Sequence, residues 1–364
     1  MLAVALRFFF AARPDLCEKW YGRYCFVIGR NAWDTVFGWS PVPMLYVFIS
    51  SILIIILLQI LFFIIRKKKK TPPSPVYKRF LNGTANFFLS ITAFLSLTIG
   101  LFLVQWGYNY CRPSLETEIN LHPADTLTLA DLRSEAHYIT TLAAESRSKI
   151  PAITERAYRK QPVIADLEPV VRQCLVAVLA DLHYPTPGCV RGRELPAGTL
   201  LSFNTAGVYL PWVGEGHIDA GLHPLQKPFT LAHEMSHGYG FTDEGTCNFL
   251  AYLACSRSAD PYIRYSGQLA YWRYVFSALR EKNRPAYLLT RARIPRGIHN
   301  DLAAIKDAMA RYPDRLKGLQ ASAYDGYLKS QGIANGLGSY DYIVQLAIAW
   351  RKKNDSYKLK PSNI

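Results

Sequence analysis

Charged residues are scarce in this sequence, and several features typical of disordered, fibrous or thiol-rich proteins are missing. Only 19% of the 364 residues are charged and 50% are hydrophobic, which excludes a disordered or fibrous chain. The seven cysteines form no CxxC pair, so neither a thiolate zinc cluster nor a thioredoxin-like motif is expected. Four of them follow residue 112, and the sequence does not distinguish disulfides from buried free thiols.

Acidic residues are absent from the stretch where basic residues are most concentrated. Residues 66–79 contain seven Lys and Arg side chains and no acid, and they contribute much of the net charge of +15. This stretch lies between two uncharged hydrophobic runs. The excess charge therefore indicates a membrane topology, and no nucleic-acid partner is expected.

The two uncharged runs, residues 44–65 and 86–106, predict transmembrane helices. A helix over 44–65 would be about 33 Å long, which matches a hydrocarbon core of about 30 Å. Because basic loops stay in the cytoplasm, residues 66–85 are expected there, with both chain ends outside. The sequence thus predicts a multi-pass protein of the bacterial inner membrane, in contact with lipid, whose residues 112–364 form an exported periplasmic domain.

The first 43 residues form an N-terminal extracytoplasmic segment in this topology. Residues 1–12 are apolar but too short to cross a membrane, and Arg7 interrupts them. They fit either the remnant of a signal or first helix, or a segment lying at the membrane interface.

The exported domain is predicted to be mainly α with a small β-sheet. Residues 195–212 suggest two short strands and a turn, and within them residues 207–212 could form an edge strand that aligns a peptide. Apolar residues at three- and four-residue spacing predict helices elsewhere. These helices cover residues 127–148, 163–182, 229–239, 244–255, 262–282, 299–312, 315–330 and 340–352.

Residues 233–237, His-Glu-Met-Ser-His, form an HExxH motif in one predicted helix. Side chains four residues apart share a helix face, so His233 and His237 can bind one Zn²⁺ through imidazole nitrogen. Glu234 follows the first ligand and can act as a general base toward a water molecule. Because the chain has only eight histidines, a chance match is rare.

Two adjacent carboxylates could provide the third ligand. Asp243 completes a metzincin-like spacing, but Asp is also a favoured helix N-cap. Glu244 would instead coordinate from the first turn of the next helix, with Asn248 one turn later to orient His233. We favour Glu244 and keep Asp243 as the alternative. His217 and His223 could line the site or donate to an oxyanion, but a structural hydrogen bond is the favoured interpretation for both. Tyr340 is a weaker candidate for stabilising a transition state.

The stretch HEMSHGYGFTDEGTCNFLAYLAC resembles a family of bacterial membrane proteins named domain of unknown function 3810. The paired spans, residues 207–211, Tyr265-Ser266-Gly267, Tyr327-Leu328-Lys329 and Gly338-Ser339-Tyr340 match as well, so the resemblance covers about residues 20–352. Thr246 departs from the Glu that many relatives carry. The resemblance implies a zincin-like, gluzincin-type metallopeptidase domain with Glu244 as ligand.

These observations predict a membrane-anchored zinc peptidase that hydrolyses peptide bonds in a peptide or protein substrate, with Glu234 as general base. Two alternatives remain open. One is a scaffold in which zinc is purely structural, for which Glu234 would not be needed. The other is an amidase acting on cell-wall peptides by the same chemistry. The oligomeric state does not follow from the sequence.

Overall fold

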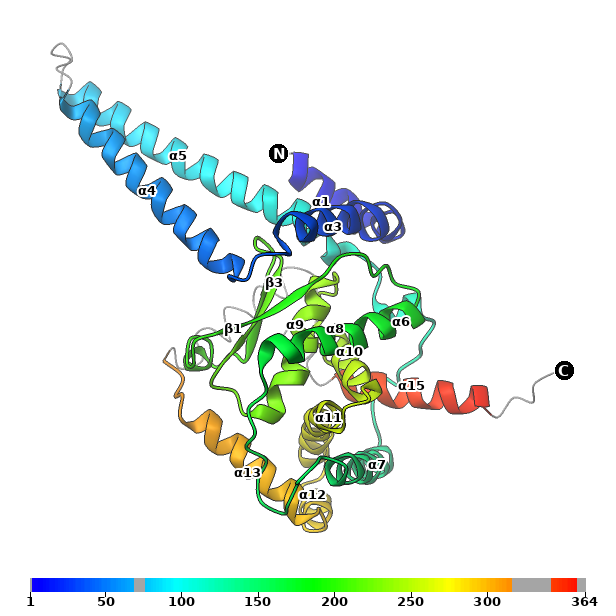
Figure 1. Cartoon of the computed structure of the whole chain (residues 1–364). Coiled ribbons are helices and arrows are strands. Elements are labelled where there is room, and N and C mark those ends of the chain that lie inside the picture. The colour runs from blue at the N-terminus through cyan, green and yellow to red at the C-terminus, as the bar shows by residue number, and fades with distance from the viewer. Residues whose placement is uncertain (1, 69–75, 316–341, 359–364) are drawn as a thin grey trace.

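The structure is a computed structural model that describes residues 2–68, 76–315 and 342–358. The chain after residue 112 forms a mostly helical domain with a three-stranded sheet, from which two long helices project (Figure 1). The predicted class, mainly α with a small sheet, is confirmed at this level.

The helices of the domain agree closely with the predicted ranges. Of the predicted helices, 315–330 falls almost wholly outside the described residues, as does the start of 340–352. The described helices of the domain are α6 (Leu115–Glu118), α7 (Leu129–Ser148), α8 (Ile164–Asp181), α9 (Lys227–Gly238), α10 (Glu244–Arg257), α11 (Pro261–Lys282), α12 (Arg284–Arg291), α13 (Arg296–Ala310) and α15 (Ile343–Lys358).

The sheet has the order β1-β3-β2, with strands β1 (Arg191–Leu195), β2 (Gly207–Leu210) and β3 (Glu215–Asp219). The central strand β3 runs parallel to β1 and antiparallel to β2. The sequence prediction placed only two strands in residues 195–212, so it missed β3 and began β1 too late. The cause is that β3 is fully buried although it carries Glu215, His217 and Asp219, which are atypical of a core strand.

Helix α9 packs on one face of the sheet, and the main core fills the space between this layer and helices α7, α8, α10 and α11. The segment Tyr265-Ser266-Gly267 supports this arrangement from α11. The Ser266 hydroxyl donates to the Leu225 carbonyl over 2.7 Å and accepts from the Phe229 N–H over 3.3 Å, at the start of α9. A Cβ at Gly267 would lie 2.4 Å from Cys255 Cβ, so glycine permits the close approach of α10 and α11.

The projecting pair consists of α4 (Met44–Lys68) and α5 (Val76–Gln105). Residues Met44–Leu61 form an apolar helix long enough to cross a membrane, and only 6% of them are buried, unlike the core helix of a soluble protein. Within the described chain no other helix meets that criterion, since the apolar run Leu89–Gln105 is shorter. The second predicted span is therefore not supported at its full length. Both helices also extend into the predicted loop 66–85.

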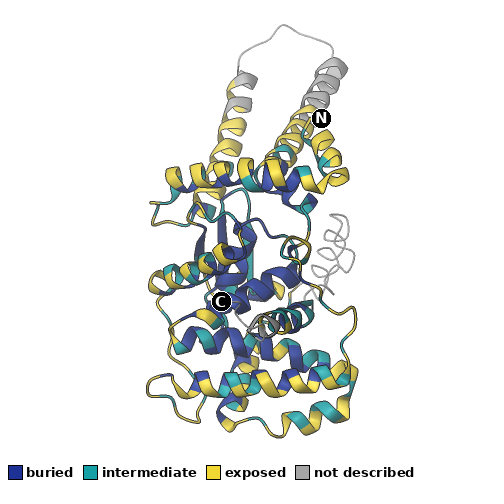
Figure 2. Ribbon diagram, turned by 90° about the vertical axis from the view of Figure 1, so that its right-hand side faces the viewer, coloured by how far each residue is buried: buried dark blue, intermediate teal, exposed yellow. Residues whose placement is uncertain are grey.

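The N-terminal segment lies between this helix pair and the sheet. It contains α1 (Leu2–Ala12) and one continuous helical stretch formed by α2 (Pro14–Leu16), the π-helical η1 (Cys17–Cys25) and α3 (Phe26–Phe37). Figure 2 shows exposed residues on the projecting helices and on the helix across their base, whereas buried residues concentrate in the domain below.

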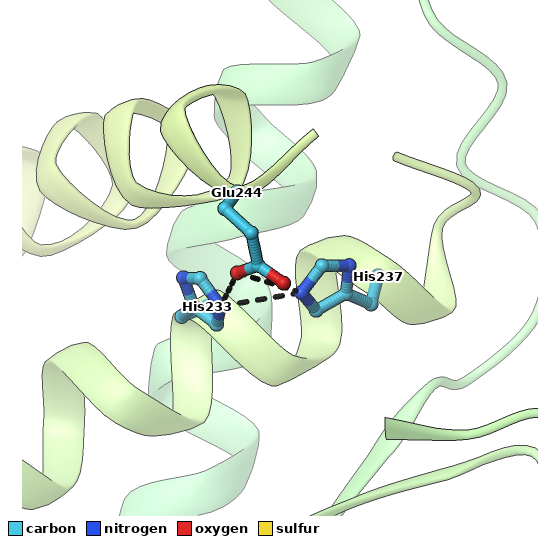
Figure 3. Close-up of side chains that lie close together, drawn as sticks. All are labelled: His233, His237 and Glu244. Atoms are coloured by element: carbon cyan, nitrogen blue, oxygen red, sulfur yellow. Dashed lines mark hydrogen bonds and ion pairs between the residues drawn. The ribbon is translucent and has the colours of Figure 1, made fainter. Parts of the chain in front are cut away.

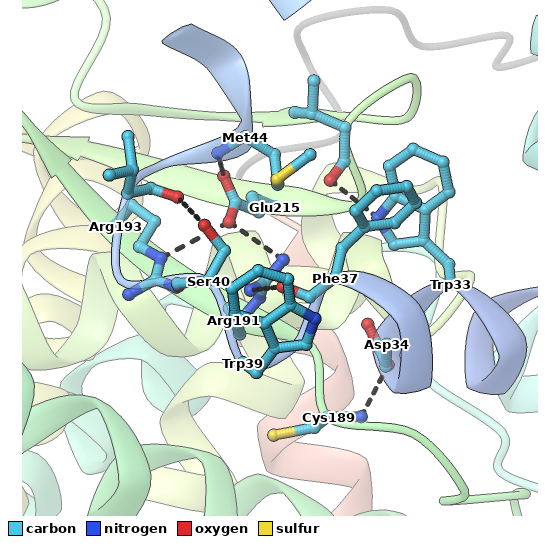
Figure 4. Close-up of polar contacts among 12 residues, drawn as sticks. Trp33, Asp34, Phe37, Trp39, Ser40, Met44, Cys189, Arg191, Arg193 and Glu215 are labelled. Carbon is cyan, nitrogen blue, oxygen red and sulfur yellow. Dashed lines mark hydrogen bonds and ion pairs between the residues drawn. The ribbon is translucent and has the colours of Figure 1, made fainter. Parts of the chain in front are cut away.

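Hydrogen bonds attach this N-terminal segment to the sheet and the loops beside it (Figure 4). The Arg191 and Arg193 guanidinium groups donate to the carbonyls of Phe37 and Ser40 over 2.6 and 2.8 Å. The backbone N–H of Met44, the first residue of α4, donates to Glu215 over 2.7 Å. The start of α4 is thus fixed directly to the central strand.

Candidate metal centre

Helix α9 presents His233, Glu234 and His237, and a sharp chain reversal brings α10 back beside it. Pro228 lies in the first turn of α9, where its missing N–H is not needed. Gly240 adopts a φ of +95° after the helix, a conformation that favours glycine. Asp243 then caps α10, its carboxylate accepting the Thr246 N–H over 2.7 Å. This reversal places Glu244 in the first turn of α10, next to both histidines.

The cluster of His233, His237 and Glu244 is compact and buried (Figure 3). The two Nε2 atoms are 3.2 Å apart. Glu244 Oε2 lies 3.0 Å from Nε2 of His233 and 3.6 Å from Nε2 of His237. Two ligand atoms about 2.1 Å from one tetrahedral Zn²⁺ are about 3.4 Å apart. The donor set and its spacing therefore fit a single zinc ion.

A hydrogen bond fixes the protonation of His237. Its Nδ1 lies 2.9 Å from the Phe241 carbonyl and 3.4 Å from Cys247 Sγ. Because a carbonyl only accepts, Nδ1 carries a proton, and in the neutral imidazole the Nε2 lone pair is then left for a metal. Sequence reasoning missed both partners. Cys247 could have been found from its position three residues after Glu244 on the same helix. The Phe241 partner is a backbone carbonyl, and no residue type in the sequence indicates such a contact.

The predicted hydrogen bond between Asn248 and His233 Nδ1 is not formed, because that nitrogen has no hydrogen-bond partner among the described residues. Asn248 is buried on α10 as expected, but it does not orient His233 through this atom. The prediction failed because spacing along α10 fixes a helix face and not the direction of an amide.

Charge within the cluster favours metal binding. Burial alone raises the pKa of Glu244, but the adjacent His237 and His233 hold it well below its usual value. Glu244 is therefore an anion at neutral pH, the form in which a carboxylate binds a cation.

Glu234 lies beside the cluster and faces the sheet. A Cβ added at Gly207 would lie 2.5 Å from Glu234 Oε1, so this carboxylate reaches the backbone of the edge strand β2. Burial raises the pKa of Glu234 to about 7, while His233, His237 and a backbone hydrogen bond with Tyr209 oppose the rise. A carboxyl group with a pKa near neutrality can both accept and return a proton.

The weaker candidates are not part of the cluster. Asp243 serves as the N-cap described above. His217 lies on β3, fully buried with Nε2 3.5 Å from Glu215, on the sheet face opposite α9. His223 caps a short 3₁₀ turn, accepting the Leu225 N–H over 3.4 Å. Tyr340 lies outside the described residues. Neither histidine belongs to the cluster, and a role for either one in lining a substrate site stays a prediction.

The predicted edge strand is present, since among the described residues β2 pairs with β3 and with no other strand. It lies next to α9, and its Tyr209 ring is 5.9 Å from that of Trp106 at the end of α5. The Trp106 indole in turn donates to the His237 carbonyl over 2.8 Å. The end of α5 thus contacts both the candidate metal helix and the edge strand.

We expect Gly216→Ala to destabilise the domain, because β3 and α9 approach too closely for a side chain. A Cβ at this position would lie 2.7 Å from Glu234 Cβ and 3.2 Å from its backbone carbon. Overpacking of this kind costs about 1–3 kcal/mol. Thermal unfolding of the full chain measures the effect. Gly29→Ala on α3 is the control, since nothing lies within 4 Å of its Cβ, and equal stability of the two variants contradicts the packing described here.

Comparison with known proteins gives one match. The family model described as "Protein of unknown function (DUF3810)" matches residues 21–348, which include the candidate metal centre and both projecting helices. No curated protein and no solved structure matched the chain. Because the model spans most of the sequence, the chain belongs to the DUF3810 family.

Proposed function

We propose that this protein is a membrane-anchored, zinc-dependent peptidase. The observation that carries the proposal is the convergence of His233, His237 and Glu244 at separations that fit one zinc ion, with a second carboxylate, Glu234, buried beside them. A structural zinc site does not need this additional proton acceptor. This ligand set, two histidines and a glutamate, supports a gluzincin-type centre in a zincin-like domain.

The proposed roles follow from position. Bound zinc supplies polarisation of the scissile carbonyl and acidification of a water molecule. Glu234 accepts the proton of the attacking water at its carboxylate and passes it to the leaving amine. His237, held by the Phe241 carbonyl, keeps its Nε2 toward the metal. The edge strand β2 aligns an extended peptide by main-chain hydrogen bonds.

The contact of Trp106 with α9 bears on where the substrate is found. Because the end of α5 reaches the metal helix, a peptide held along β2 lies close to the membrane. The substrate class we propose is therefore a peptide segment near the membrane surface.

The alternatives, a zinc scaffold and a cell-wall peptide amidase, differ in the outcome of one experiment. If the protein is a peptidase, Glu234→Gln abolishes peptide cleavage and zinc stays bound. If it is a scaffold, the native chain cleaves no peptide and the substitution changes nothing. If it is an amidase, only the cleavage of cell-wall peptides is lost.

We further propose that α4 and α5 cross the membrane as a hairpin, with the domain on the outer face. Support comes from the large apolar residues that α5 exposes in its described part, among them Leu89, Phe94, Leu97 and Val104. The two helices project from the same side of the domain in Figure 1. The basic residues between them favour a cytoplasmic loop.

Reporter fusions test this topology. A reporter that works only in the cytoplasm should be active when it is inserted at Pro73, because the basic loop stays inside. A reporter that works only outside the cytoplasm should be active when it is fused to the C-terminus. At each site, a second reporter that needs the opposite compartment serves as the control and should be inactive. The same compartment for both positions contradicts the hairpin.

A further inference from the structure

In the helical stretch over residues 14–37, several charged residues are buried and several large apolar residues are exposed. Three of its six charged residues, Glu18, Arg30 and Asp34, are buried against the protein, whereas Arg23 is half-buried and Asp15 and Lys19 are exposed. Glu18 pairs with Arg112 over 2.5 Å, Arg30 donates to the Pro187 carbonyl, and Asp34 accepts the Cys189 N–H over 2.6 Å. The outward face instead exposes Trp20, Tyr24, Ile28 and Val36, each by more than half. A helix facing water shows the opposite pattern.

Three of the exposed residues lie four positions apart along this stretch. Residues four apart lie on the same side of a helix, so their side chains share one face. Trp20 and Tyr24 in η1 and Ile28 at the start of α3 follow this spacing. Lys19, also exposed, places its ammonium group 5.5 Å from the Trp20 ring, where a long side chain can extend to a polar layer.

This apolar face continues into its neighbours on both sides. On one side, α1 exposes Leu2, Phe8 and Phe9, and it is fixed to the base of α5 by a 2.8 Å hydrogen bond from the Tyr108 hydroxyl to the Ala3 carbonyl. On the other side, Trp39 and Val42 are exposed in the connection to α4. Both figures place these segments at the base of the projecting helices (Figures 1 and 2).

We propose that α1 and residues 14–42 form a surface that lies in the interfacial layer of a lipid bilayer. The occupant is lipid because the same surface continues directly into α4, whose apolar residues Met44–Leu61 are almost all exposed and suit a hydrocarbon environment. Exposed Trp and Tyr are typical of the headgroup region, and an apolar helix face partitions there. The hydrogen bonds of residues 30–44 to the sheet then hold the domain flat against the membrane.

A native cysteine allows a direct test. Cys25 is exposed on η1, and the other two thiols that are not buried, Cys174 and Cys189, are removed by Cys174→Ser and Cys189→Ser. The full chain, with a fluorophore on Cys25, is placed in nanodiscs of phosphatidylcholine and phosphatidylglycerol. Some of the lipids carry a nitroxide quencher near the headgroup end of the acyl chain. The matched control adds Cys25→Ser and Leu289→Cys, which moves the label to an exposed site on α12, far from the projecting helices (Figure 1).

We expect nitroxide lipid to quench the fluorophore at Cys25 several-fold more strongly than the fluorophore at the control site. Iodide in the water should quench the fluorophore at the control site more strongly than the one at Cys25. Equal lipid quenching at the two sites, with Cys25 open to iodide, overturns the proposal because the face then points to water. Protection of Cys25 from both quenchers also overturns it, because a protein, such as a second copy of this chain, then covers the face. Unchanged thermal unfolding of each labelled chain shows that the fold is intact.

Discussion

Replacing Glu234 with Gln should reduce peptide cleavage by about a hundredfold to ten-thousandfold, the range that general acid–base catalysis contributes. The amide keeps the size of the side chain and its place against β2, but it cannot accept a proton. Because Glu234 is not one of the three clustered ligands, zinc content should stay close to that of the native chain. The measurement is mass spectrometry of new peptide termini after incubating a peptide mixture with the full chain in nanodiscs.

The matched control for this variant is Glu145→Gln, the same change at an exposed surface residue that pairs with Lys149. Its cleavage should equal that of the native chain. If Glu234→Gln cleaves as fast as the control, Glu234 is not the base. If it loses zinc together with activity, Glu234 acts as a ligand or supports the fold, and the division of roles proposed here is wrong.

Glu244→Gln should weaken zinc binding by more than about a hundredfold, because the loss of a partner outside the ligand set alone costs about 10–100-fold. Glu244 Oε2 lies 3.0 and 3.6 Å from the two histidine nitrogens, and its charge supplies the anionic ligand of the cluster. A neutral amide oxygen in the same place is a poorer ligand for a dication. The measurement is competition for zinc with a chelating dye.

The neighbouring acid gives an unusually close control. Asp243→Asn is also an acid-to-amide change, one residue earlier in the chain, and Asn caps a helix about as well as Asp. Since Asp243 accepts the Thr246 N–H and is not in the cluster, its amide variant should bind zinc almost as tightly as the native chain. The reverse order of the two affinities would make Asp243 the ligand and contradict the geometry described here.

Much of the candidate site follows from local sequence signals. The HExxH spacing fixes His233 and His237 on one face of α9. Gly240 and Asp243 mark the reversal and the next helix cap, and these two signals place Glu244 beside the histidines. The choice of Glu244 over Asp243 rested on the capping preference of Asp, and the structure places both residues accordingly. Local signals were sufficient because fewer than a dozen residues separate the ligands.

Other features depend on contacts between distant segments, and the sequence did not reveal them. The strand β3 carries polar residues that are satisfied only by remote partners, for example the four backbone N–H groups that Asp219 accepts from Gly198, Leu200, Leu201 and Gly221. His217 resembled a site residue because the sheet face on which it lies could not be known. The same applies to the docking of residues 30–44 on β1 and β3.

Zinc X-ray absorption of the native full chain in nanodiscs tests the central claim most directly. We expect about one zinc per chain, coordinated by imidazole nitrogen and carboxylate oxygen at about 2.0–2.2 Å, with no sulfur ligand. Cys247 Sγ lies 3.4 Å from Nδ1 of His237, on the other side of the ring from the cluster, so it is not expected to bind the metal. Absence of zinc from the purified chain, or a sulfur ligand at about 2.3 Å, would contradict the proposed metal centre.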